Sequence, residues 1–251
     1  MLGWLGAVMY PFLRIGGCLM VAPVFGASHV PRRVRVLLAM ALTVAVQPVL
    51  PPVPALDLQS VDGIFTGVQQ ILIGIALGFV LQIAFDALAL AGQLLANGMG
   101  LGFAFNMDPL RGAQSPVLGQ LYVIVGTLTF LALDGHIALL RLLVGSFQTL
   151  PIGPTGIGTR QLFGIATWGS TLFSGALHIA LPGMTSLLVI NLAFGVTSRA
   201  APALNLFALG LPVTLMFGLI IVLLGLPAMQ TGFTQLLAET FTNLQSLVAP
   251  R

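Results

Sequence analysis

Few side chains in this sequence could do chemistry. Asp134 and His136 flank Gly135 and would bring an acid and a base together, as in a catalytic or proton-relay site. Asp-Gly is also a turn signal, and His136 opens an apolar run, so a structural turn is the favoured interpretation. Asp86 lies deep in an apolar segment, where a carboxylate costs about 2.5–3.5 kcal/mol to insert. We expect it to face protein, water or a partner arginine, and we favour a subunit contact over a proton site.

The motifs of known catalytic sites are absent from the sequence. His178 stands alone in an apolar stretch, without a second histidine or an acid at helical spacing, so we expect no metal site. No GxSxG, HExxH or paired acids occur, and without lysine the chain cannot form a GxxxxGK[ST] loop. The sequence therefore predicts neither an enzyme nor a cofactor-binding protein.

Composition sets the class of protein. Hydrophobic residues make up 57% and charged residues 6% of the chain, whereas soluble domains have roughly 25% charged residues. The chain is therefore expected to be an integral membrane protein. Its net charge of +3 rests on nine arginines and six acids, and it does not indicate nucleic-acid binding. The single cysteine, Cys18, lies in an apolar run and is expected to pack as a small hydrophobe.

Uncharged stretches long enough to span a membrane indicate helices throughout. Residues 63–85, 112–133, 161–198 and 200–238 all reach the roughly 20 residues that one span needs. The last two are too long for a single span, and we expect helix breaks at Pro182-Gly183, at Gly210–Pro212 and at Gly225–Pro227. Residues 2–25 and the shorter 36–50 add two segments. The sequence therefore predicts an all-α integral membrane fold of about six to seven hydrophobic segments, several of them broken.

Small and polar residues within these segments suggest helix contacts. Gly74 and Gly78 form a small-xxx-small face, a weak signal for close helix packing. Asn191 and Arg199 stand two turns apart on one predicted helix. Both are candidates for subunit contacts. Alternatively, Arg199 extends to the helix end while Asn191 bonds to a neighbouring helix.

The stretch GLGFAFNMDPLRGAQSPVLGQ at residues 100–120 interrupts the apolar pattern. Its glycines and Asp-Pro turn predict a loop over residues 103–114 that carries Phe103, Phe105 and Met107. Irregular backbone at membrane depth must be buried in protein or line an aqueous cavity. Apolar loop residues could then seal an aqueous path by dewetting. An ordinary surface loop that touches lipid headgroups explains the residues equally well.

Three segments carry a resemblance to a known family: GFAFNMDPLRGAQSPVLGQLY, FLALDGHIALLRLLVGSFQTLPIG and NLAFGVTSRAAPALNLFALGLPV. In the order of these segments and in overall length, the chain resembles the FliR family of flagellar biosynthetic proteins, which is part of the type III secretion export gate. The resemblance implies an inner-membrane protein of the bacterial flagellar basal body. Its expected partners are FliP-like and FliQ-like gate subunits, an FlhB-like switch protein and unfolded flagellar substrates.

The resemblance also implies an architecture. Family members are built from curved helical hairpins and join a closed helical hetero-oligomer around an export channel. Residues 1–198 would be the FliP-like part and residues 199–251 the FliQ-like hairpin. The family's plug loop falls on residues 102–112, with Phe103, Phe105 and Met107 facing the channel axis. The complete set of expected plug residues is Gly102, Phe103, Phe105, Met107, Asp108, Pro109 and Gly112, and Arg111 is a departure whose orientation the resemblance does not assign.

A small-solute secondary transporter is the alternative function. Such a protein would show internal repeats and polar clusters at matching places in its two halves. The sequence shows neither feature. A structural channel subunit that helps to form and close an export pore is therefore the favoured interpretation.

Overall fold

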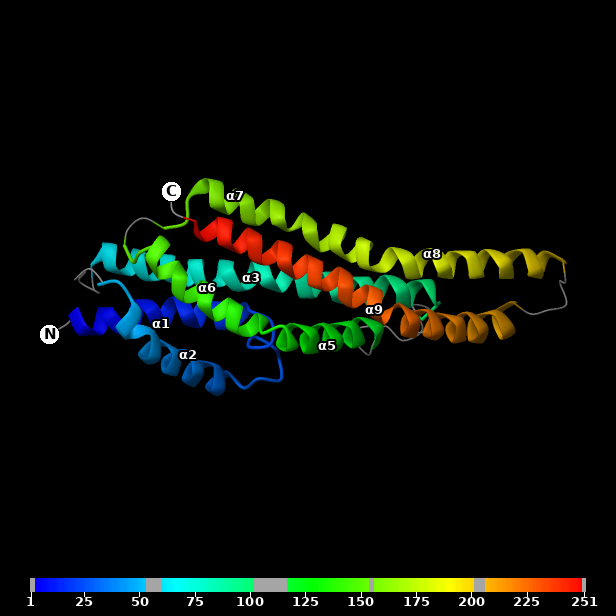
Figure 1. The fold of residues 1–251 in the computed structure, drawn as a ribbon, viewed down its shortest axis with the longest axis horizontal. Helices are drawn as coiled ribbons and strands as arrows, with labels where there is room; N and C mark the ends of the chain where they lie inside the picture. Colours follow the sequence, from blue (N-terminus) through cyan, green and yellow to red (C-terminus); the bar gives the residue numbers. More distant parts are fainter. Residues whose placement is uncertain (1–2, 53–59, 102–116, 154–155, 201–205, 250–251) are drawn as a thin grey trace. The chain divides into compact units, whose positions relative to one another are not determined.

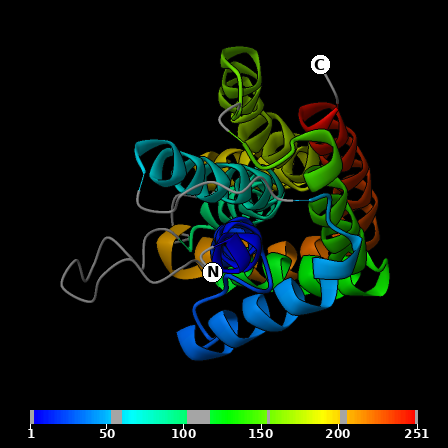
Figure 2. The same cartoon turned by 90° about the vertical axis from the view of Figure 1, so that its left-hand side faces the viewer.

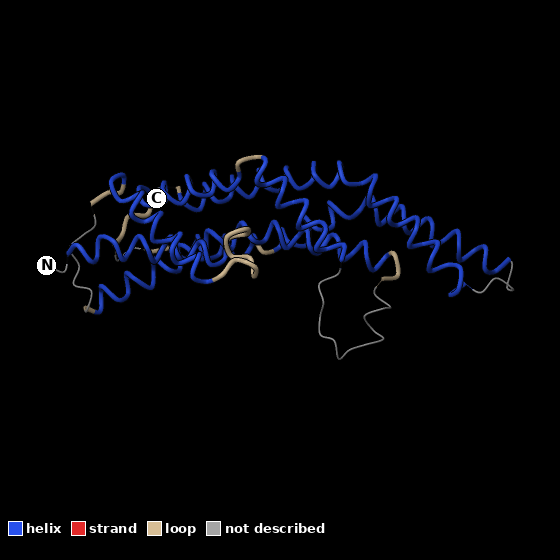
Figure 3. Tube along the Cα trace, turned by 90° about the horizontal axis from the view of Figure 1, so that it is seen from below, coloured by secondary structure: helices blue, strands red, loops and turns tan. Residues whose placement is uncertain are grey.

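A computed structural model describes residues 3–52, 60–101, 117–153, 156–200 and 206–249, and every regular element in these ranges is a helix (Figures 1 and 3). The elements are α1 (Gly3–Val21), α2 (Arg32–Val46), a 3₁₀ turn (Gln47–Val49), α3 (Val61–Gly98), α5 (Val117–Ala132), α6 (Gly135–Thr149), α7 (Thr159–Trp168), α8 (Ser170–Ala200) and α9 (Leu206–Val248). The expected all-α fold is confirmed.

Several of these helices can cross a membrane. Three helical stretches are long and apolar enough to do so: Val61–Gly98, Thr159–Thr197 and Pro212–Val248. The pair α5 and α6 adds a fourth span if it is counted as one bent unit, and Gly6–Val21 is a shorter apolar helix. These lengths and compositions confirm the membrane class that the composition indicated.

The predicted helix breaks at proline are wrong. α8 continues through Pro182, and α9 continues through Pro212 and Pro227. A proline removes one amide donor and leaves the carbonyl four residues earlier without it, a disturbance that apolar helices tolerate when neighbouring groups pack around it. Ser186 donates to the carbonyl of Pro182 at 2.9 Å, and Thr231 donates to the carbonyl of Pro227 at 3.0 Å, so the turn after each of these prolines is helical. The prolines are therefore accommodated within long helices.

A sharp bend occurs instead at Leu133-Asp134, between α5 and α6. The two helices meet at 67°, and Asp134 adopts a left-handed conformation with φ of 54°. Gly135 follows directly, and a Cβ there would overlap the ring of Phe130. The turn that Asp134-Gly135 predicted is therefore confirmed, and the acid and the histidine belong to a helix start.

The chain divides into two compact units, each assembled from separate stretches. Unit 1 comprises residues 1–83, 130–170 and 237–251, and unit 2 comprises residues 84–129 and 171–236. Unit 1 contains α1, α2, α6 and α7, and unit 2 contains α8, while α3, α5 and α9 contribute to both. The expected division at residue 198 concerns likeness to partner subunits, so it stays a prediction.

Within unit 1, α1 lies beside α2 and crosses α3 at very close range (Figure 2). A Cβ on Gly74 would overlap the carbonyl oxygen of Arg14 and come within 2.9 Å of the Cys18 nitrogen. A Cβ on Gly78 would lie 2.7 Å from the Cys18 oxygen, and one on Gly17 would lie 2.8 Å from the Ile71 oxygen. The small-residue face at 74 and 78 thus lets the two backbones touch, as its spacing suggested.

The same crossing holds a buried arginine. Arg14 is completely buried, and its guanidinium donates to the side-chain oxygen of Gln70, to the carbonyl and hydroxyl of Ser146, and to the carbonyl of Leu150. The Nε–Gln70 distance is 2.8 Å, and the guanidinium carbon lies 4.2 Å from the centre of the Phe147 ring. One side chain of α1 therefore binds both α3 and α6, so these three helices are held as a group.

Replacing Gly74 with alanine should destabilise the protein, because the added methyl group overlaps the backbone of α1. Overpacking of this kind typically costs about 1–3 kcal/mol, so the thermal unfolding midpoint in mild detergent should fall by several degrees. Gly145→Ala in α6 is the matched control, since a Cβ there meets nothing within 4 Å. Alanine also favours helix by about 1 kcal/mol over glycine, so this control should melt at the wild-type temperature or above. Equal losses in both variants would contradict the close crossing.

Replacing Arg14 with methionine should also lower the unfolding midpoint. The substitution keeps the apolar stem but removes the donor that Arg14 supplies to the side-chain oxygen of Gln70 and to the carbonyl of Leu150, at about 1–3 kcal/mol for each group left unsatisfied. Arg160→Met removes an exposed arginine from α7 of the same unit and should change the midpoint little. If both variants unfolded at the same temperature, the buried arginine would contribute nothing to the stability of unit 1.

Candidate functional site

The predicted plug residues lie outside the described residues. This holds for all seven of them: Gly102, Phe103, Phe105, Met107, Asp108, Pro109 and Gly112. The structure does describe the two helices that lead into and out of this segment. α3 ends at Gly98 and α5 begins at Val117, and the stretches on either side of the segment belong to unit 2. The described part of the candidate site therefore consists of the end of α3, the start of α5 and the helices that pack against them.

α3 and α5 meet backbone to backbone beside the segment. A Cβ on Gly92 would lie 2.6 Å from the Leu118 oxygen and 2.7 Å from the Cα of Gly119. A Cβ on Gly119 would lie 2.8 Å from the Ala89 oxygen. Any larger side chain at these positions would push the helices apart. The pair of glycines therefore fixes the spacing of the two helices from which residues 102–116 emerge.

The end of α3 is also held by α8 and α9 within unit 2. Asn191 of α8 donates from its side-chain nitrogen to the carbonyl of Gly98 at 3.2 Å. Met99 is 1% exposed, and its side chain fills the space beside Gly218 of α9, where a Cβ would overlap it. These contacts give Asn191 the bond to a neighbouring helix that we considered for it. Its amide is also exposed, so a further contact with another subunit stays a prediction.

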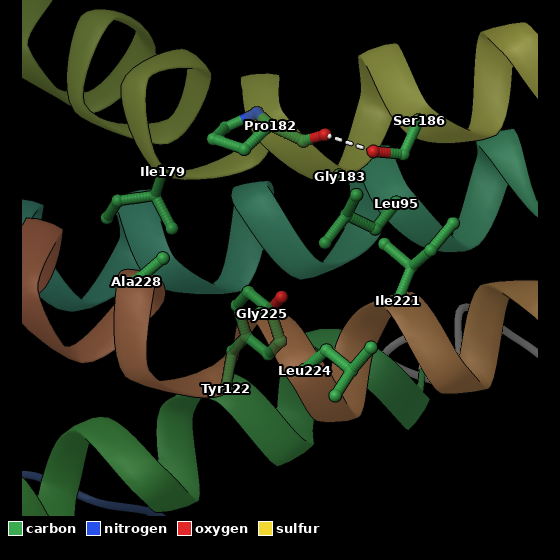
Figure 4. Close-up of a pocket in the computed structure, with 10 residues that line it drawn as sticks. All are labelled: Leu95, Tyr122, Ile179, Pro182, Gly183, Ser186, Ile221, Leu224, Gly225 and Ala228. Carbon is green, nitrogen blue, oxygen red and sulfur yellow. Dashed lines mark hydrogen bonds between the residues drawn. The ribbon is translucent and has the colours of Figure 1, made fainter.

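A cavity of about 260 Å³ lies next to this helix end (Figure 4). It is lined by Leu95 of α3, Tyr122 of α5, Ile179, Pro182, Gly183 and Ser186 of α8, and Ile221, Leu224, Gly225 and Ala228 of α9. The hydroxyl of Ser186 donates to the Pro182 carbonyl, so it is already bonded within its own helix. The lining offers no activated nucleophile or base. The cavity can accept an apolar group through van der Waals contacts, and its lining indicates no catalytic role.

The remaining candidates for subunit contacts lie apart from this cavity lining. Asp86 is half-buried in α3, directly after Phe85, whose ring meets Phe233 of α9 edge to face at 5.3 Å. Arg199 is exposed in the last turn of α8. The structure therefore does not bring Asp86, Asn191 and Arg199 together into one site, and their roles in assembly stay predictions.

Groups that could hold a metal do not gather in the described part of the chain. No set of three or more histidines, cysteines, aspartates or glutamates comes together there. Cys18 is fully buried among apolar neighbours of unit 1, which confirms its expected role in packing.

Arg14 is a structural residue that we did not predict from the sequence. We assigned residues 2–25 to one apolar span without considering the cation in its middle. The signal was present, because an ionisable residue inside an apolar helix is rare and faces protein or water when it occurs. Its partners could not be inferred in advance, since Gln70 and Ser146 are 56 and 132 residues away in sequence.

Comparison with known proteins shows the family of the chain. Residues 5–240 match the family described as bacterial export proteins, family 1. The flagellar biosynthetic protein FliR of Escherichia coli (strain K12) is 38% identical over 250 residues, which cover 99% of this chain and 95% of that protein. FliR of Pectobacterium carotovorum is 38% identical with the same coverage of both chains, and FliR of Bacillus subtilis is 26% identical over 97% of this chain and 95% of its own length.

The match to the family extends over nearly the whole chain, and the related proteins are covered almost end to end. Together with the apolar helices of the structure, this places the protein in a membrane and in flagellar biosynthesis. The chain belongs to family 1 of the bacterial export proteins.

Proposed function

We propose that this chain is a structural channel subunit of the flagellar type III protein export gate in the bacterial inner membrane, within the flagellar basal body. Its partners in this proposal are FliP-like, FliQ-like and FlhB-like proteins, and its cargo is unfolded flagellar substrate. Family membership and the names of its relatives support the role in export. Residues 102–112 would close the channel to small solutes until substrate arrives.

The observation that best supports closure by this segment is the crossing of Gly92 and Gly119. A segment that closes a channel must move aside for substrate and then return to the same position. The helices on either side of it must therefore be rigidly packed. Backbone contact between α3 and α5 supplies such packing on both sides of the segment. Phe103, Phe105 and Met107 supply apolar surface, and a dry constriction blocks ions by dewetting. The closure would thus combine a rigid anchor with an apolar loop.

Membership of a larger assembly is supported by the apolar outer faces of α8 and α9. Their outward side chains are large and at least half exposed: Leu188, Val189, Leu192, Val196, Met216, Leu219, Leu223 and Leu224. Lipid or other apolar helices must cover such faces. Neighbouring gate subunits are the cover that we propose for part of them.

Removing the segment should make the assembled gate leak. Deletion of residues 104–110, or Phe103→Ser combined with Phe105→Ser, should leave subunit assembly intact and raise membrane conductance several-fold. The reason is that an open pore lets ions flow down a membrane potential worth about 2.3 kcal/mol per charge for each 100 mV. Conductance of bilayers containing the purified complex is the measurement.

The matched control for this experiment is Phe163→Ser combined with Phe173→Ser. These two phenylalanines are 71% and 65% exposed in α7 and α8, outside the segment. They should leave conductance at the wild-type level. A tight membrane after deletion of the segment would show that the seal lies elsewhere, while export-gate membership would still stand.

Asp86 distinguishes a subunit contact from a proton site. If its carboxylate meets an opposite charge of another subunit, Asp86→Asn should weaken assembly and Asp86→Leu should weaken it at least as much, because the partner's charge is left buried and unpaired. Asp62→Asn, at an exposed aspartate in the first turn of α3, is the control and should assemble normally. The yield of purified complex and the export rate are measured in parallel. Normal assembly combined with abolished export in both Asp86 variants would favour proton transfer instead.

A further inference from the structure

Two cavities of unit 1 share one arginine. The first has a volume of about 310 Å³ and is lined by aliphatic side chains of α1, α2 and α6, namely Ile15, Leu42, Val46, Ile137, Leu140, Leu143 and Val144, together with Arg141. The second has a volume of about 610 Å³ and includes Asp134, Phe241 and Gln245 in its lining. Ile137 and Arg141 line both. Arg141 therefore stands between an aliphatic space and a mixed one that also carries polar side chains.

The guanidinium of Arg141 is available for a ligand. The side chain is exposed, and within the described ranges it makes no hydrogen bond or ion pair. Two other arginines of unit 1 are engaged within the chain: Arg14 binds three residues, and Arg35 donates to the carbonyls of Ala27 and Val30 at 2.6 and 3.0 Å. Arg141 lies in the middle of α6, whose neighbours in sequence are mostly leucines. A cation in such surroundings needs an anion or water.

The second cavity adds polar groups of another kind. Asp134 and Gln245 are both exposed and both line it, Asp134 from the bend before α6 and Gln245 from the last part of α9. Asp134 is two helical turns from Arg141, so a carboxylate and a guanidinium face one cavity from separate positions. A ligand for this space therefore carries an anion for Arg141 and hydroxyl or amino donors for the carboxylate.

We propose that these two adjacent cavities together bind one anionic glycerophospholipid. The acyl chain lies in the aliphatic cavity, and the phosphate accepts hydrogen bonds from Arg141, whose planar fork suits phosphate oxygens. The hydroxyl groups of the headgroup donate to Asp134 and accept from the amide of Gln245. The combined volume lies within the range of small-molecule sites, roughly 300–1,000 Å³. Charge selects the occupant: a purely apolar partner helix would leave Arg141 buried without an anion.

The test uses the full chain extracted from bacterial membranes in mild detergent, with the subunits that copurify. Native mass spectrometry identifies retained lipid. After lipid removal, binding of phosphatidylglycerol is compared with binding of phosphatidylcholine. The wild type should retain an anionic phospholipid and prefer phosphatidylglycerol. Arg141→Gln should bind both lipids roughly tenfold more weakly, because each carries the phosphate that loses its charge-assisted contact. The preference for phosphatidylglycerol should persist in this variant, because it rests on the headgroup hydroxyls that contact Asp134 and Gln245.

Two further variants complete the design. Arg160→Gln removes an exposed arginine of the same unit that lines neither cavity, and it should keep the wild-type affinity for both lipids. Val144→Trp fills the aliphatic cavity and should weaken both lipids together. Thermal melts of all variants separate lost binding from lost folding, and the comparison of Arg141→Gln with Arg160→Gln stands without the tryptophan variant.

Three outcomes would overturn the proposal. The first is a wild-type protein that retains no anionic lipid and shows no preference after addition. The second is equal lipid binding by Arg141→Gln and Arg160→Gln. The third is a photo-crosslinker at position 137 that captures a polypeptide of the complex in place of lipid. None of these outcomes bears on the export function, because the lipid site is argued from unit 1 alone.

Discussion

A cation surrounded by neutral oxygens is the constraint on which unit 1 depends. A charge is expensive to bury unless every donor finds an acceptor, and Arg14 finds them on α3 and α6. Gln70 and Gly74 stand one turn apart on the same face of α3. Gly74 lets the backbone of α1 at Arg14 touch that face, and the side-chain oxygen of Gln70 accepts a hydrogen bond from the guanidinium of Arg14. The close crossing and the buried arginine thus form one local arrangement, because the short distance between α1 and α3 brings Arg14 within hydrogen-bonding reach of Gln70.

The fold class was predictable because it follows from properties that every part of the chain shares. Low charge and high hydropathy leave few structures besides apolar helices, since lipid cannot bond to free backbone groups. The bend at Asp134-Gly135 was predictable because both residues tolerate the turn locally. The continuity of the helices through Pro182, Pro212 and Pro227 was not predictable, because whether a proline ends a helix depends on what surrounds it. Here α8 and α9 continue through all three prolines.

The candidate site was predictable only in part. Sequence indicates an apolar loop over residues 103–114, and its placement stays a prediction. Gly92 and Gly119 gave no usable signal, because glycine is frequent throughout this chain and only a contact between two helices distinguishes a packing glycine from any other. The same applies to Arg141. Its type was visible, but its position between two cavities depends on residues of α1, α2 and α9 that sequence order keeps far apart.

The discontinuous make-up of unit 1 has a consequence for synthesis. The unit contains the first 83 residues, a middle stretch and the last 15, and Gln161 of α7 donates to the carbonyl of Leu247 near the end of α9 at 2.8 Å. Ribosomes deliver the N-terminal helices first, at about 5–20 residues per second. The earliest helices to leave the ribosome must therefore wait for the latest before their unit is complete. During that interval their unpaired faces depend on lipid, insertion factors or other proteins for cover.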